Sequence, residues 1–73
     1  MKEKRDIEKT YSKKNFVAKL RRLADAIENK KKFEIQIAGE RIYAPVRAVF
    51  NIEHERGGTE EEIEFQIKWQ NQE

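Results

Sequence analysis

The chain has 73 residues, of which 41% are charged, with a net charge of +2 and no cysteine. This length suits one small domain, and the lack of cysteine excludes a disulfide framework, a thiolate metal site and a thiol nucleophile. No apolar run approaches the roughly 18 residues of a membrane span, and no apolar signal segment follows the charged start. We therefore expect a complete, soluble, cytoplasmic protein, and dimerisation would supplement its small core.

The charges are divided between the two ends of the chain. Residues 1–32 hold twelve Lys and Arg against five acids, a net charge of +7, whereas residues 33–73 hold four against nine, a net charge of −5. One end is therefore basic and the other acidic.

The first residues predict a tail, then a strand and then a helix. Residues 1–5 are charged and are expected to form a flexible tail, which leaves 6–73 as a single domain. Residues 6–11 fit a short strand, although Lys9 interrupts its apolar face. From residue 13 to residue 29 apolar residues recur at helical spacing, with Ser12 as N-cap and Asn29 at the end. The helical stripe comprises Phe16, Val17, Leu20, Leu23, Ala24 and Ile27.

Alternation of apolar and polar residues predicts two strands in residues 33–46. With Gly39 and Glu40 as a two-residue loop, Ile37 faces Ile42, and a glycine at the first loop position suits a type II′ turn. Pro45 cannot donate to a strand ladder, so it should mark a bulge, an edge or the end of its strand.

A second hairpin is predicted from residue 50 to residue 69. With Gly57 and Gly58 as its loop, Ile52 faces Ile63, while acids face acids on the outer side, and a register moved by two residues would keep them so. The predicted fold is α+β. One amphipathic helix packs on one face of a mainly antiparallel sheet of four to five strands, in the order β-α-β-β-β-β.

These residues resemble the amphi-Trp domain family of small prokaryotic proteins. The resemblance rests on Ser12, which opens the helix, on residues 33–46 (FEIQIAGERIYAPV) and on residues 62–69 (EIEFQIKW). It also rests on the helical residues Leu20, Leu23, Ala24, Asp25, Ala26 and Ile27. It implies the fold but no activity, because the family as known has none assigned. The basic run from Lys30 to Lys32 departs from the acidic members of the family.

The basic end offers one candidate site. Lys and Arg neutralise phosphates, so a polyanion could contact Lys14, Arg21, Arg22, Lys30, Lys31 and Lys32. The helical residues among them flank both sides of the apolar stripe, and no helix-turn-helix, zinc or RNP motif accompanies them. A scattered, solvated surface is the interpretation that we favour.

The outer sheet face offers another candidate, a partner face of Tyr43, Glu53, Glu62 and Glu64. Clustered carboxylates can hold a hard cation, but flat strands leave them in water, so we expect no metal and no cofactor. A basic partner, such as the helix of another copy, would suit this face electrostatically.

Two single residues complete the candidates. His54 is the only histidine, and it should lie on the inward face with Glu61 opposite; without a paired nucleophile, a structural role is favoured over acid–base chemistry. Trp69 alternates with Phe65 and Ile67, which predicts an anchor at the edge of the core, with an exposed binding hot spot as the alternative. We expect a non-enzymatic module for protein interaction or self-association. The alternative is weak, salt-sensitive nucleic-acid binding through the basic tail and helix.

Overall fold

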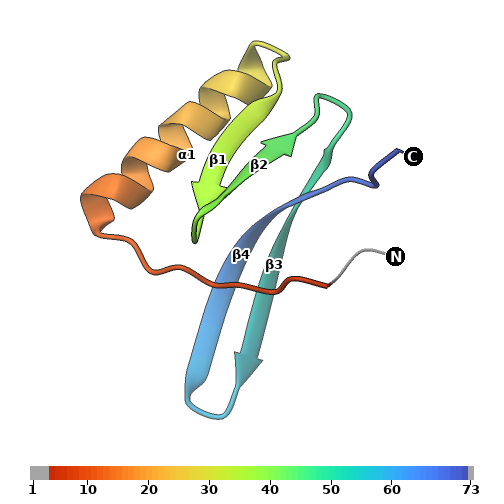
Figure 1. Cartoon of the computed structure of the whole chain (residues 1–73). Helices are drawn as coiled ribbons and strands as arrows, with labels where there is room; N and C mark the ends of the chain where they lie inside the picture. The colour runs from red at the N-terminus through yellow and green to blue at the C-terminus, as the bar shows by residue number, and fades with distance from the viewer. Residues whose placement is uncertain (1–3, 73) are drawn as a thin grey trace.

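One helix and four strands follow one another along the chain in the computed structural model, which describes residues 4–72 (Figure 1). The elements are α1 (Lys13–Glu28), β1 (Phe33–Ile37), β2 (Glu40–Ala44), β3 (Val49–Gly57) and β4 (Glu60–Lys68). The α+β class is confirmed. No helix within residues 4–72 has the length and apolar character needed to cross a membrane.

The helix begins and ends at the predicted residues. At its start the Ser12 hydroxyl accepts a hydrogen bond from the Asn15 backbone N–H at 3.2 Å, which satisfies a donor that the first turn leaves unpaired. At its end the Asn29 side chain donates to the Asp25 carbonyl at 2.8 Å. Lys30 then takes a positive φ of 54°, a conformation that commonly ends helices.

The predicted single sheet is wrong, because the strands form two separate antiparallel hairpins, β1–β2 and β3–β4. β2 ends at Ala44, directly before Pro45, as the missing proline N–H predicts. The Ala48 N–H then donates to the Pro45 carbonyl at 3.1 Å. This turn separates β2 from β3, so the two strands do not pair.

The predicted strand over residues 6–11 is also wrong, since these residues form no strand. Lys9 interrupts their apolar alternation, and neither hairpin takes them up as a further strand. Arg5, from the predicted tail, donates to the Ile37 carbonyl at 2.8 Å and pairs with Glu40 at 3.5 Å. Residues 1–3 of that tail lie outside the described residues.

Both hairpin registers differ from the predicted ones by two residues. In β1–β2, Ile35 pairs with Ile42, and the loop is Ala38–Gly39. Both loop residues have positive φ, 48° and 85°, which fits a type I′ turn and not the predicted type II′ turn. The primed turn matches the twist of the flanking strands, so the alanine accepts a left-handed conformation.

In the longer hairpin Ile52 pairs with Phe65 and not with Ile63, because the loop lies at residues 58–59. The shift by two keeps each side chain on its predicted face. It also keeps acid opposite acid on the outer face, as predicted, with Glu53 now paired with Glu64.

The core is small. Among the described residues, the buried apolar side chains are those of Phe33, Ala44 and Ala48. Phe33 begins β1, Ala44 ends β2 and Ala48 directly precedes β3. The far end of the β3–β4 hairpin projects away from α1 and the first hairpin (Figure 1). α1 itself has no fully buried residue. The domain therefore leaves much of its apolar surface uncovered.

Candidate functional site

The most conspicuous exposed surface is one face of the β3–β4 hairpin. Because side chains alternate between faces, four apolar residues from the two strands lie together on it. We call this surface the hairpin face and define it by Phe50, Ile52, Ile63 and Phe65. Their exposed fractions are 51%, 67%, 67% and 68%. Isolated apolar residues on a surface are ordinary, but a continuous apolar face is typical of an interaction site.

The hairpin face continues into an apolar groove of about 330 Å³. α1 contributes Phe16 and Leu20 to the groove, which are 54% and 40% exposed. β4 contributes Phe65 and Ile67, and Trp69 follows directly after the strand. Trp69 is half-buried here, which confirms the predicted position at the edge of the core.

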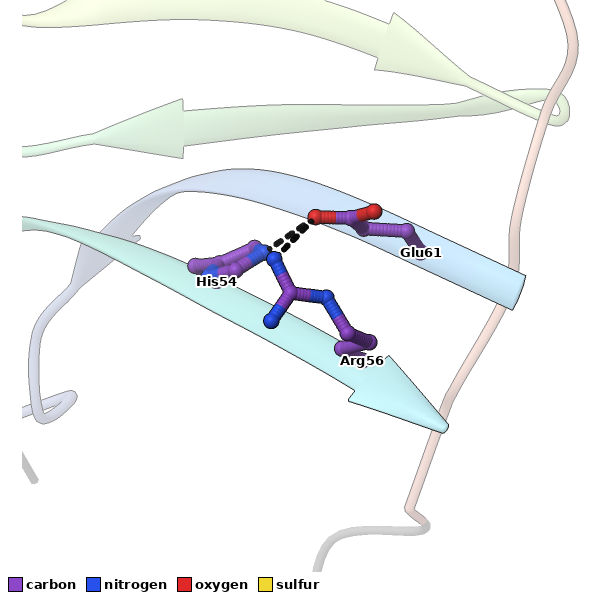
Figure 2. A network of polar contacts seen from close by, with 3 residues as sticks. All are labelled: His54, Arg56 and Glu61. Carbon is purple, nitrogen blue, oxygen red and sulfur yellow. Dashed lines mark hydrogen bonds and ion pairs between the residues drawn. The ribbon is translucent and has the colours of Figure 1, made fainter. Parts of the chain in front are cut away.

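A polar cluster lies on the same face toward the hairpin turn (Figure 2). His54 Nε2 lies 2.8 Å from Glu61 Oε2, and an Arg56 guanidinium N–H donates to the same oxygen at 2.9 Å. The hydrogen bond with Arg56, which has the larger effect, and the hydrogen bond with His54 both lower the pKa of Glu61. His54 reaches Glu61 diagonally, since its direct partner is Ile63 and not Glu61 as predicted. The contacts join β3 to β4 on a surface where each side chain is at least half exposed.

The opposite face of the hairpin is acidic. Glu55, Glu62 and Glu64 each place a carboxylate oxygen within 4.8 Å of the others. Hydrogen bonding by Glu64 and then by Glu55 raises the pKa of Glu62, and their negative charges add to this effect. The structure thus brings Glu62 and Glu64 of the predicted partner face together with Glu55. The Gln66 side-chain amide donates to both Glu53 and Glu64 and so joins these two residues. Tyr43 lies in the other hairpin, where Lys32 Nζ is 5.4 Å from the centre of its ring.

Replacement of Glu62 by glutamine (E62Q) is expected to raise the free energy of unfolding at neutral pH. The folded pKa of Glu62 lies above its ordinary value of 4.5, so its contribution to stability is fully present below 4.5 and is lost as pH rises through the folded pKa. The pH dependence of the contribution from Glu61 has the opposite sign. Because the folded pKa of Glu61 is lowered, its contribution to stability is lost on acidification. Removal of Glu62 should therefore also weaken any gain in stability on mild acidification.

Urea unfolding of wild type and E62Q, at neutral pH and near the ordinary carboxyl pKa, measures this effect. Glu60→Gln (E60Q) is the matched control, because Glu60 lies on the same strand outside the acidic trio. An E62Q variant that is less stable than wild type at neutral pH would contradict the assignment of repulsion to this trio.

The candidate polyanion residues are divided by the fold. Arg22 and the run Lys30 to Lys32 line one shallow depression, which Asp25 and Glu34 also line. Arg22 donates to the Glu34 carbonyl at 3.1 Å and lies over the Phe33 ring, and Lys32 lies 3.9 Å from a Glu34 carboxylate oxygen. Lys14 and Arg21 lie on α1 and do not line this depression. Four of the six residues are thus brought together, but among acids.

Sequence reasoning missed the hairpin face as a candidate site, because it treated every inward residue as covered. A signal was present in the strand lengths. β3 and β4 have nine residues each, against five in β1 and β2, and at about 3.3 Å per residue the second hairpin is roughly 13 Å longer. The turn end of the second hairpin extends beyond the first hairpin (Figure 1).

Comparison with known proteins assigns a family. The model of the Amphi-Trp domain matches residues 1–73, which is the full chain. No curated protein and no solved structure matches this chain. The match confirms the resemblance that Ser12, the two hairpin segments and Trp69 carry in the sequence. The chain therefore belongs to the Amphi-Trp domain family.

Proposed function

We propose that this domain is a non-enzymatic protein-interaction module that presents the hairpin face to a partner protein. One observation carries the proposal: Ile52, Ile63 and Phe65 form a continuous apolar face and are each about two-thirds exposed. Apolar area of this kind gains free energy when a partner removes it from water, at about 25 cal/mol per Å². A protein surface supplies the matching apolar side chains.

The charges near this face favour a protein over a nucleic acid. The reverse of the hairpin carries Glu55, Glu62 and Glu64 close together, and such a surface repels phosphates. Arg22 and Lys32, two of the cations that would contact a polyanion, already contact Glu34 and aromatic rings within the chain. A non-enzymatic role is supported by His54 and Glu61, whose side chains are 50% and 53% exposed and are not shielded from water.

Site-specific photo-crosslinking tests the proposal. The photoreactive analogue p-benzoylphenylalanine replaces Phe65 on the hairpin face, or Asn51 on the opposite face of the same hairpin as the matched control. After irradiation in extract from the native host cells, position 65 is expected to give a discrete protein adduct, and position 51 to give much less. The mass of the adduct then identifies the partner.

Two results would overturn the proposal. One is an equal adduct pattern from positions 65 and 51, which would show no preference for the apolar face. The other is the absence of any protein adduct at position 65 together with retention of nucleic acid that weakens steeply between low and moderate salt. That second result would favour the depression lined by Arg22 and Lys30 to Lys32.

A further inference from the structure

The free chain buries too little surface for its size. Its accessible surface is 7048 Å², whereas a compact monomer of 8.8 kDa exposes about 4,800 Å². The radius of gyration is 13.9 Å, against about 11 Å for a compact chain of this length. The excess surface, roughly 2,200 Å², exceeds the about 800 Å² that each partner buries in a standard interface. Residues 4–11 contribute to it, and so does the projecting hairpin.

We infer that the partner is a second copy of this chain, and this inference rests on the proposed function. In the arrangement that we propose, the far half of the hairpin face of each copy, Ile52 and Ile63, lies in the groove of the other copy beside Phe16 and Leu20. Each copy therefore places its hairpin in the groove of the other, and a two-fold axis relates the two copies, which is the commonest symmetry of soluble homodimers.

Continuity of the apolar surface supports this arrangement. The groove and the far half of the hairpin face belong to one surface, which runs from half-buried Ile67 through Phe65 to Ile63. Two such surfaces placed face to face and antiparallel bring the far half of each over the groove of the other. The groove, at about 330 Å³, lies in the size range of pockets that accept apolar groups.

Charge complementarity favours a copy of the same chain over an unrelated protein. The turn end of the hairpin carries Glu55, Glu60 and Glu62 on its reverse face, while on the hairpin face Glu61 is paired with Arg56. Lys19 lines the groove, with its Nζ 4.9 Å from the centre of the Tyr11 ring, and Lys13 and Lys14 begin the same helix. A reciprocal dimer places this acidic end near the basic helix of the partner twice, so opposite charges lie near each other at the border of the interface.

Sedimentation equilibrium of the purified full chain tests the inference. The expected mass is twice 8.8 kDa for wild type, with a shift to the single-chain mass for Ile63→Asp. Val49→Asp is the matched control, because Val49 is 62% exposed on the other face of the same hairpin, and it should leave the doubled mass unchanged. A wild type that sediments as a single chain up to its solubility limit would overturn the inference.

Cysteine pairing tests the arrangement without placing a charge in the interface. The chain has no cysteine, so a chain with Ile63→Cys can be mixed with a chain with Leu20→Cys and oxidised under native conditions. A disulfide-linked heterodimer is expected, and Val49→Cys in place of Ile63→Cys should give little. If Ile63→Cys chains link chiefly to each other, the placement of the hairpin in the groove is wrong.

The two sets of experiments separate the inference from the proposed function. A single-chain mass for the purified protein, combined with a position-65 adduct to a different protein in extract, would refute self-association and leave the interaction module standing. A single-chain mass combined with either of the two crosslinking results that overturn the proposed function would refute both.

Discussion

Replacement of Phe33 by alanine (F33A) is expected to unfold the domain at room temperature or to bring it close to unfolding. Phe33 is the only large side chain that is buried among residues 4–72, with 8% exposure, and the Arg22 guanidinium lies 5.4 Å from its ring centre. Truncation of a buried phenylalanine costs about 3–5 kcal/mol, whereas a chain of this length has a total stability of roughly 4–11 kcal/mol. With so small a core, the lower end of that range is appropriate.

Urea titration followed by far-ultraviolet circular dichroism measures this loss through the signal of α1. Tyr43→Ala (Y43A) is the matched control, because Tyr43 is 51% exposed on the adjacent strand and contacts Lys32 at the surface. Y43A is expected to cost about 1 kcal/mol or less. If F33A unfolded at the same urea concentration as Y43A, the core would not lie where the structure places it.

Replacement of Trp69 by alanine (W69A) is expected to lower the free energy of unfolding by about 2 kcal/mol. Full burial of a tryptophan is worth about 3–5 kcal/mol, and Trp69 is half-buried where it lines the groove. Its indole N–H also donates to the Asn71 side chain at 3.0 Å. Loss of the ring leaves Phe65 and Ile67 with less cover.

Replacement of Trp69 by phenylalanine (W69F) distinguishes the contribution of the apolar ring from that of the hydrogen bond to Asn71. It retains most of the ring area and should cost about 1 kcal/mol. Since Trp69 is the only tryptophan of the chain, its fluorescence reports this site alone, and the native emission should lie to the blue of that of the unfolded protein. Native emission at the fully hydrated wavelength, or a W69A variant as stable as wild type, would contradict the position of Trp69 at the core edge.

Much of the local structure could be predicted, because it depends on neighbours in the sequence. Ser12 and Asn29 bound the helix through contacts within one turn, and Pro45 ends its strand because it lacks an N–H. The alternation of side chains along a strand correctly predicted that Phe65 and Ile67 lie on the same face.

The candidate site was only partly predictable. The contact between His54 and Glu61 was expected, and so was the repulsion of facing acids. The openness of the hairpin face was not, because apolar alternation indicates which side chains avoid water without showing what covers them. Exposure depends on the path of the chain after Pro45, which places the second hairpin apart from the first.

The sequence by itself determined the α+β class, the helix and the face on which each strand residue lies, since these depend on periodicity and on residues close along the chain. Only the tertiary structure decided the two registers, the separation of the hairpins and the absence of a strand over residues 6–11. The physical reason is that a register shift of two residues leaves every side chain on the same face. The hydrophobic pattern is therefore equal in both registers, and the backbone conformations of the turns, such as the positive φ of Ala38 and Gly39, distinguish them.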